Sequence, residues 1–259
     1  RLTVKLSNAA GPVVRRIMAE ISAARAPGGP KELTVALEVP WDGKDAAGQA
    51  LPDGPYAYGV TGELVIFHLN KHDPKAVLQE FSKATSNALH GALLLDATVP
   101  AAFGFAPADG SFVNLKRPAL AASYHDAGSG IDLTTVRVLL DGQAVSATAS
   151  SDGFVFQPTA DLAEGSHAVS LSVGDLAGNV LGPVTWSFFV DTQNPMVSGL
   201  SVAPKAITNL RRPACSGNFL DPEPSSGLNL SAVRLTLDGQ EVAAQAVVSA
   251  TGFQFTPAA

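Results

Sequence analysis

Cysteine is almost absent from this sequence, which has a single one, Cys215, in 259 residues. One thiol cannot close an internal disulfide, so the chain is not a disulfide scaffold and has to draw its stability from ordinary apolar cores. Cys215 stands where Leu120 stands in an internal repeat described below. This position favours a small buried apolar side chain over a reactive thiol.

Charged residues are scarce as well, at 15% of the chain, and they do not gather by sign. The 17 Lys and Arg are scattered among 23 Asp and Glu, for a net charge of -6, so no basic stripe can neutralise phosphates. Nucleic acid is therefore not an expected partner. No apolar run approaches the roughly 20 residues that cross a bilayer, so membrane insertion is not expected either. With 46% hydrophobic residues, the composition is that of a globular chain.

No catalytic constellation is visible. A Ser-His-Asp triad built on His125 or His167 lacks the Gly-x-Ser-x-Gly elbow, and both histidines stand at ends of predicted strands, where we expect exposed side chains. Gly128-Ser129-Gly130 lacks the third glycine and the helix of a dinucleotide loop. Tyr and Trp number only three and two, which leaves no evident platform for sugars, and Trp41 and Trp186 fit core positions better. We expect no enzyme.

An internal repeat is what the sequence does contain. The stretch from Asp126 to Gln143 returns in large part from Asp221 to Gln240. Other pairs keep the same order: Asp96 and Asp191 in linkers that end in Pro, Arg117-Pro118 and Arg212-Pro213, Ser129-Gly130 and Ser226-Gly227, Leu140-Asp141-Gly142-Gln143 and Leu237-Asp238-Gly239-Gln240, Gly153-Phe154 and Gly252-Phe253. Self-similarity of this kind indicates one structural unit copied along the chain.

The copy from 96 to 190 shows about seven short alternating strand candidates, separated by polar or glycine-containing turns, which is typical of a β-sandwich. Three of the strand candidates lie at 119–125, 144–150 and 153–158. Alternation along the strands predicts which side chains face the core. The predicted core residues are Val136, Val138, Leu140, Val169, Leu171, Val173 and either Trp186 or Phe188.

The first third opens with an alternating strand at 1–8 and a second apolar stretch from Val13. After another alternating stretch at 32–39 comes "PWDGKDAAGQALPDGPYAYGV", which reads as tight turns at Asp42-Gly43 and Asp53-Gly54 leading into an aromatic strand through Tyr56 and Tyr58. The pattern Trp-Asp-Gly, Gly48, Pro-Asp-Gly and aromatic strand resembles the immunoglobulin-like domain of the flagellar hook-capping protein. The resemblance covers residues 1–69 and implies a fold rather than a site.

The segment at 70–92 is the least regular, and two structures are open for it. One is a short helix after Pro74, and the other is a long surface hairpin inserted before the last strand. His68 and His72 stand four residues apart beside Asp73, as zinc ligands on a helix would, but Pro74 and the flanking strand pattern favour solvated loop histidines.

Taken together, the linker Asp, "SGID", "LDG", "GFVFQP", "DLAGN" and "FVDT" resemble the tandem bacterial immunoglobulin-like repeats of secreted and surface proteins. The resemblance implies an all-β fold of tandem immunoglobulin-like β-sandwiches. We expect a hook-capping-like domain at 1–95 with an irregular insertion at 70–92, a complete bacterial domain at 96–190, and a truncated one at 191–259.

Calcium at the junctions is the sharpest site hypothesis, because hard divalent cations take six to eight oxygens and loops at sandwich ends supply them. Some tandem repeats of this kind hold ions there, so the resemblance implies candidates. Asp, Asn and Gly also fill such turns with no metal, since they cap their own backbone. In the later copy Asn229 replaces Asp132. The candidate ligands are Asp126, Asp132, Asp175, Asn179 and Asp191, with Asp96 at the equivalent linker.

The first functional hypothesis is a non-enzymatic stalk or spacer segment of a large bacterial secreted or cell-surface protein, whose partners are the neighbouring modules of its own chain. Two alternatives stay open: an adhesin-type module that recognises an extracellular glycan or protein through its loops, and accessory domains of a secreted hydrolase. The chain starts at Arg1 without an initiator Met and stops in mid-repeat, which indicates a fragment. The expected location is extracellular or at the bacterial cell surface.

Overall fold

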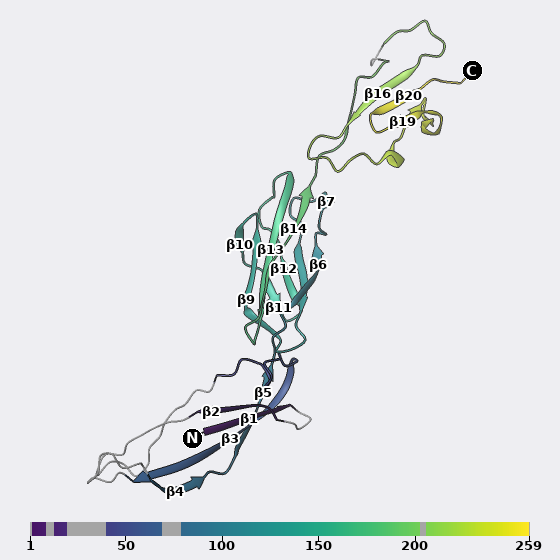
Figure 1. The fold of residues 1–259 in the computed structure, drawn as a ribbon. Coiled ribbons are helices and arrows are strands. Elements are labelled where there is room, and N and C mark those ends of the chain that lie inside the picture. Colours follow the sequence, from purple (N-terminus) through teal and green to yellow (C-terminus); the bar gives the residue numbers. More distant parts are fainter. Residues whose placement is uncertain (1, 9–12, 20–39, 69–78, 203–205, 259) are drawn as a thin grey trace. The chain divides into compact units, whose positions relative to one another are not determined.

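The computed structural model describes residues 2–8, 13–19, 40–68, 79–202 and 206–258, and its regular structure there is β-strand apart from two short 3-10 turns (Figure 1). The expected all-β fold class is confirmed. No helix in this described part is long and apolar enough to cross a membrane. Contacts divide the chain into two compact units: Arg1–Pro100 with Asp126–Ile131 and Asp175–Asn179, and Ala101–His125 with Asp132–Gly174 and Val180–Ala259.

One five-stranded sheet lies in the first unit, with order β2-β1-β3-β4 and β5 also paired to β3. The long strand β3 has 15 residues and serves two partners in turn, β5 from Gly54 to Val60 and β4 from Glu63 to His68. The strands are β1 (Leu2–Asn8), β2 (Val13–Ala19), β3 (Gly54–His68), β4 (Gln79–Thr85) and β5 (Leu89–Leu95).

The segment at 70–92 is only partly described, and where it is described it is strand. β4 and the start of β5 occupy it, so of the two alternatives left open, the helix after Pro74 is wrong at 79–85 and the hairpin applies there. Local apolar spacing could not reveal this, because β4 is held by its ladder to the second half of β3. Residues 70–78, which include His72, and the strand expected at 32–39 lie outside the described residues.

The Trp41-Asp42-Gly43 stretch leads into a turn that the Asp45 carboxylate caps. The Asp45 carboxylate accepts from the N–H groups of Ala47 and Gln49 at 2.9 and 2.8 Å, and Lys44 bridges to Ala50. The Trp41 indole N–H donates to the carbonyl of Lys44 at 2.9 Å, and its ring meets the buried Tyr56 ring edge-on at 5.8 Å. Trp41 is half-buried, so it covers Tyr56 rather than filling a core.

The central part of the chain forms two sheets, ordered β10-β9-β13-β14-β7 and β11-β12-β8-β6. Within these sheets, β9 with β10, β13 with β14, β11 with β12, β12 with β8 and β8 with β6 are antiparallel pairs, and β14 with β7 is a parallel pair. The strands are β6 (Ala101–Ala106), β7 (Ser111–Val113), β8 (Leu120–His125), β9 (Ile131–Leu140), β10 (Gln143–Val145), β11 (Thr148–Ser150), β12 (Gly153–Phe156), β13 (Gly165–Asp175) and β14 (Val180–Val190).

The core of this sandwich follows the predicted alternation. Val138, Leu140, Val169, Leu171 and Val173 are buried, and Val136 is half-buried. Trp186 and Phe188 are both buried, because residues two apart in a strand share a face. The facing sheet contributes Leu120, Tyr124 and Phe154, which are exposed by 2% or less.

Two features of the sandwich differ from the sequence expectation. The single strand expected at 144–150 is two short strands, β10 and β11, in different sheets, because the chain crosses between the sheets at 146–147. The strand β7 was not expected, since three residues are too few to show alternation.

The last part of the chain forms a four-stranded sheet ordered β15-β16-β20-β19 and a two-stranded pair, β17 with β18. The repeat reproduces unusual backbone angles: φ is 51° at Asp141 and 50° at Asp238, and 79° at Gly142 and 80° at Gly239. Positive φ at both central residues is what a tight hairpin turn requires. The elements are β15 (Met196–Ser198), β16 (Cys215–Leu220), η1 (Leu230–Ala232), β17 (Thr236–Leu237), β18 (Gln240–Glu241), η2 (Ala243–Gln245), β19 (Val247–Ser249) and β20 (Gly252–Phe255).

Candidate metal centre

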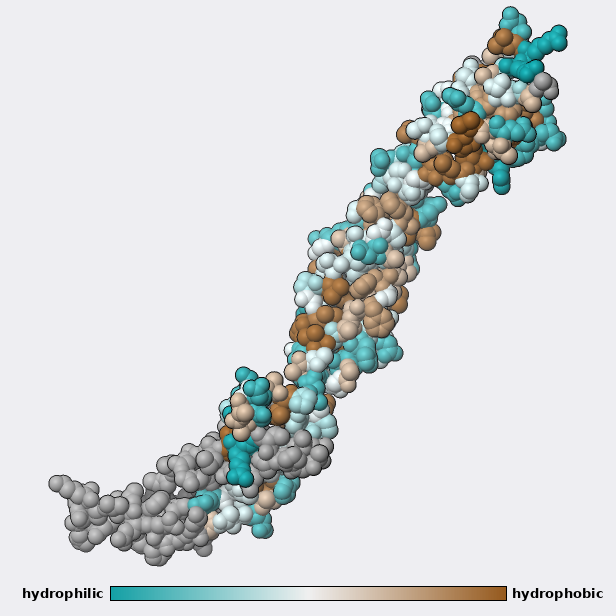
Figure 2. Space-filling view, turned by 45° about the vertical axis from the view of Figure 1, so that its right-hand side comes forward, coloured by the Kyte–Doolittle hydropathy of each residue, from teal (hydrophilic) through white to brown (hydrophobic). Residues whose placement is uncertain are grey.

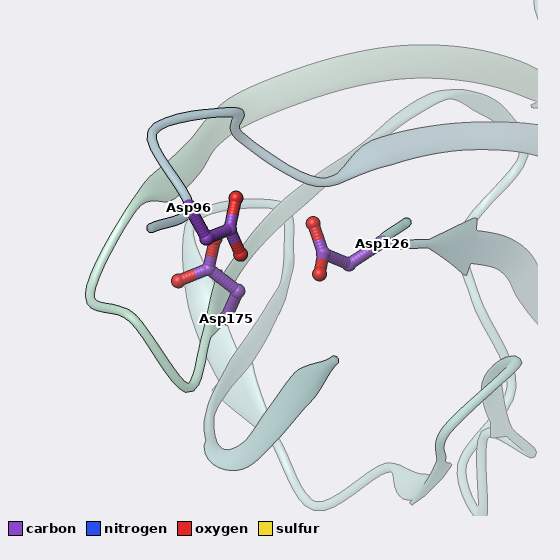
Figure 3. Close-up of side chains that lie close together, drawn as sticks. All are labelled: Asp96, Asp126 and Asp175. Atoms are coloured by element: carbon purple, nitrogen blue, oxygen red, sulfur yellow. The ribbon is translucent and has the colours of Figure 1, made fainter. Parts of the chain in front are cut away.

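Three aspartates of the first unit converge from segments far apart in the sequence. Asp96 follows β5, Asp126 follows β8, and Asp175 ends β13. One carboxylate oxygen of each lies within 4.8 Å of one from each of the others. Figure 3 shows the Asp126 carboxylate facing those of Asp96 and Asp175. The cluster therefore gathers three negative charges around one point.

Asp126 has one carboxylate oxygen that is free to act as a ligand in this cluster. Its Oδ2 accepts from the N–H groups of Gly128 and Gly130 at 3.1 and 2.7 Å, which folds the 126–130 loop around the carboxylate. Its Oδ1 is buried and has no hydrogen-bond partner. A buried unpaired carboxylate oxygen is costly, so this atom is the strongest indication that the cluster accommodates a cation.

Asp96 is held by the same loop. Its Oδ2 accepts from the Ser129 N–H at 2.7 Å and its Oδ1 from the Thr98 N–H at 3.2 Å. Hydrogen bonding by Ser129 to the ionised form holds the pKa of Asp96 below its usual range. A Cβ on Gly128 would lie 2.4 Å from the Asp96 carboxylate, so the approach of loop and linker requires glycine there.

Asp175 is 2% exposed and is fixed by Asn179. The Asn179 N–H donates to Asp175 Oδ1 and its side-chain amide to Oδ2, both at 2.8 Å, and the amide also donates to the Asp96 carbonyl at 3.1 Å. The Asn179 side chain therefore ties Asp175 to the linker and presents a donor to both. Its role is to position the carboxylate.

The donor set consists of three carboxylates, without a thiol or an imidazole among the clustered residues. Oxygen donors of this kind suit a hard cation such as Ca²⁺, which tolerates irregular geometry. Asp96, Asp126 and Asp175 would hold it, and Asn179 would orient Asp175.

Only part of the expected ligand set meets here. Asp126, Asp175 and Asn179 are together. Asp132 is not a member of the cluster: its Oδ1 caps the next turn by accepting from the Thr134 N–H and hydroxyl at 2.9 and 2.7 Å. Asp191 is not a member either, and Asp96, its counterpart in the repeat, takes the third place. The sequence feature that pointed to Asp96 was the similarity between its linker and the linker at Asp191.

Asp191 repeats the pattern of Asp96 within the second unit. Its Oδ2 accepts from the Ser226 N–H at 2.8 Å and its Oδ1 from the Gln193 N–H at 3.2 Å. Hydrogen bonding by Ser226 lowers the pKa of Asp191 as Ser129 lowers that of Asp96. Asp221 Oδ2 accepts from Gly227 N–H at 3.0 Å, as Asp126 does from Gly130.

His167 corrects another expectation. It is 7% exposed rather than solvated, and its ring nitrogens lie 2.7 Å from Asp141 Oδ2 and 3.0 Å from the Ala163 carbonyl. Both nitrogens are thus engaged in bracing the sandwich. His125 is exposed, as expected.

Among the comparisons with known proteins, the match to a family model supports the sandwich. Residues 106–192 match the family described as "Bacterial Ig-like domain". No curated protein matches the sequence. The solved structures that match include CopC from Methylosinus trichosporium OB3b (18% identity, TM-score 0.29, 35% of this chain and 94% of that one). They also include the endo-beta-1,4-mannanase from Thermotoga petrophila (15%, 0.30, 38% and 21%) and dimeric latent PorU from Porphyromonas gingivalis (14%, 0.32, 69% and 26%).

The chain thus spans 21% of the mannanase and 26% of PorU. Bacterial immunoglobulin-like domains occur in surface and secreted proteins, where they are structural or binding modules of larger chains. Residues 106–192, which form most of the central sandwich and contain Asp126 and Asp175, are similar to this family of bacterial immunoglobulin-like domains.

Proposed function

We propose that this chain is a non-enzymatic stalk segment of a large bacterial secreted or cell-surface protein. The proposal includes the three domains expected at 1–95, 96–190 and 191–259, the first of them of the hook-capping type. Each module would fold on its own core, and the linkers at Asp96 and Asp191 would limit bending. The segment would hold another part of the protein away from the cell.

The observation that carries the proposal is that both linkers are bonded in the same way. Each linker Asp accepts from the N–H of a loop serine further along, Ser129 at 2.7 Å and Ser226 at 2.8 Å. The residue after each linker Asp donates its N–H to a carboxylate earlier in the chain. Ala97 donates to Asp53 and Thr192 donates to Glu164, both at 2.9 Å. A linker fixed on both sides, twice, supports a segment whose job is spacing.

Calcium belongs to the same proposal. An ion at Asp96, Asp126 and Asp175 would join a linker residue to two loops, so it would stiffen this junction further. The unpaired Asp126 Oδ1 supports it. The ion would be structural, since its ligands come from turns and a linker.

Pulsed electron paramagnetic resonance tests the stalk. Cys215 is replaced by Ala, and nitroxide labels are placed on exposed positions at Asn87 with Thr148, and at Thr148 with Val247. We expect narrow distance distributions that broaden in Asp96→Ala for the first pair and in Asp191→Ala for the second. Asp161→Ala removes an exposed carboxylate that bonds only Arg117 in its own sandwich, and it should broaden neither.

Broad distributions in the unsubstituted chain would contradict the stalk. Saturable binding of the chain on a glycan array would favour the adhesin alternative instead.

A further inference from the structure

The last part of the chain has one sheet of a sandwich and little of the other. Strands β15, β16, β20 and β19 correspond in order to β6, β8, β12 and β11, and β17 with β18 corresponds to β9 with β10. In the central sandwich, β13 and β14 complete the second sheet. No strand among the described residues 191–202 and 206–258 takes their place.

The inner face of this sheet is correspondingly open. Leu120, Tyr124 and Phe154 are 0%, 1% and 2% exposed in the central sandwich, whereas their counterparts Cys215, Phe219 and Phe253 are only half-buried. Leu140 is 9% exposed and its counterpart Leu237 is 40% exposed. The sequence has kept apolar side chains at these positions, but the structure leaves them in partial contact with water.

A groove opens at Phe219, at one end of this face. It has a volume of about 310 Å³ and a mainly apolar lining, to which Met196, Val197, Phe219, Leu228 and Val233 contribute. Met196 and Val197 are 52% and 57% exposed. Figure 2 shows a concentration of hydrophobic surface on this part of the chain, at the upper end of the view.

A backbone edge is open in the same part of the chain. In the central sandwich β9 pairs with β10 on one edge and with β13 on the other. Its counterpart β17 pairs with β18, and no second partner is present among the described residues. An open edge next to an open apolar face is the arrangement that accepts an added strand.

The central sandwich shows which side chains such a strand would bring. The Trp186 ring lies 4.7 Å from the Phe105 ring and 6.4 Å from the Phe154 ring. The counterparts of those two are Leu200 and Phe253. Both lie against Gly217 on the open face, since a Cβ there would be 3.0 Å from Leu200 and 2.7 Å from Phe253.

We propose that the open face of β15-β16-β20-β19 is a docking surface for an antiparallel β-hairpin of the chemistry of β13 and β14. Its first strand carries large aliphatic residues at alternate positions, as Val169, Leu171 and Val173 do. Its second strand carries an aromatic residue at the place of Trp186. The hairpin continues the sheet from β17 through backbone hydrogen bonds and covers the half-buried side chains. This inference rests on the internal repeat and is independent of the stalk function.

The single cysteine provides the measurement. In an extended variant, a second copy of residues 161–191 is added directly after Ala259. This keeps the register of the central copy, because Ala258 and Ala259 correspond to Thr159 and Ala160. We expect the native-state alkylation rate of Cys215 to fall about tenfold or more, because its counterpart Leu120 is fully buried and reaction then requires local opening. The appended hairpin with its own Trp186→Ala change should protect Cys215 less.

The acceptor change Phe253→Asp, in the same extended chain, should restore the fast rate. Near-ultraviolet circular dichroism of the central sandwich is followed in parallel, so that general misfolding is recognised. An alkylation rate that the appended hairpin leaves unchanged, in a chain whose central sandwich is folded, would overturn the proposal. So would dimerisation of the original chain in sedimentation with Cys215 already protected, since a second copy would then be the occupant.

Discussion

The carboxylates of this chain illustrate how backbone hydrogen bonds and charge compete at a single residue. Asp126 uses one oxygen to shape its loop and leaves the other buried and unpaired near Asp96 and Asp175. The loop geometry thus holds like charges together. Without a cation this arrangement is unfavourable, and with one it becomes a set of ligands.

Asp126→Asn should therefore act in opposite directions with and without calcium. The amide keeps an oxygen for Gly128 and Gly130, and it puts a donor in place of the unpaired oxygen. In chelator we expect equal or greater stability, by about 1 kcal/mol at most. In excess calcium we expect the variant to lose the calcium-induced rise in melting temperature that the original chain shows.

Thermal melting in calcium and in chelator measures this, and Asp132→Asn is the matched control because Asp132 lies outside the cluster. A calcium shift that survives in Asp126→Asn would contradict the site.

Acid should destabilise the chain through its linker aspartates. Hydrogen bonds from Ser129 lower the folded-state pKa of Asp96. Its contribution to stability is thus complete above the unfolded-state pKa, about 3.9, and is lost as pH falls through the lower folded-state value. Urea unfolding at pH 7 and pH 3 measures the loss, and Asp96→Asn should show a smaller one. Asp152→Asn is the exposed control, and an equal loss in Asp96→Asn would argue against the linker bond.

At the scale of the element, the two copies of the repeat share close backbone contacts between strands as well as similar sequence. Gly153 opens β12 and Gly252 opens β20, and a Cβ on either would lie 2.4 or 2.2 Å from a carbonyl oxygen of the neighbouring strand, that of Ala122 or Gly217. The two glycines set the distance between equivalent strands. The strand pair depends on the absence of a side chain there.

Gly153→Ala should cost about 1–3 kcal/mol, because β8 or β12 has to shift to make room. Gly252→Ala should have an effect of the same sign on the last part of the chain. The measurement is the free energy of unfolding from urea titration, with Ser151→Ala in the neighbouring turn as the control. A neutral Gly153→Ala would show that β12 does not approach β8 this closely.

His167 joins two elements, and its removal should be felt in the sandwich. His167→Phe keeps the ring contact with Phe188 at 5.6 Å but loses the bonds to Asp141 and Ala163. We expect a cost of about 1–3 kcal/mol, because the buried His167 side chain makes two hydrogen bonds that phenylalanine cannot make. His125→Phe changes an exposed histidine at another strand end and should stay within about 0.5 kcal/mol. Equal effects of the two changes in urea unfolding would refute the bracing role.

At the scale of the whole molecule, equivalent residues of the repeat differ in burial. The central sandwich buries its inner faces, while the last part leaves Cys215, Phe219 and Phe253 half-buried. The same pattern of residues is therefore buried to different extents in the two places, because burial depends on the strands that cover it.

Residues 191–259 expressed alone should self-associate, since an uncovered apolar face and open strand edges are templates for another chain. Sedimentation velocity at increasing concentration checks this, with residues 96–192 expressed alone as the comparison. A monomer that melts cooperatively would contradict the expectation.

Much of the fold follows from the sequence alone. Alternation placed Val138, Leu140, Val169, Leu171 and Val173 inside the sandwich, because in a strand every second residue shares a face. Positive φ at Asp141 and Asp238 has a local cause as well, since each precedes a glycine and Asp-Gly suits a tight turn. These features are local, so neighbouring residues are enough to specify them.

Tertiary structure decided the rest, because it depends on contacts between residues far apart in the chain. It selected Asp96 for the acidic cluster and excluded Asp132, whose carboxylate turns to Thr134. It buried His167 against Asp141, split 144–150 between two sheets, and made 79–85 a strand by pairing it with β3. In each case a side chain or strand could satisfy its hydrogen bonds in more than one way, and only the distant partner determined which way was taken.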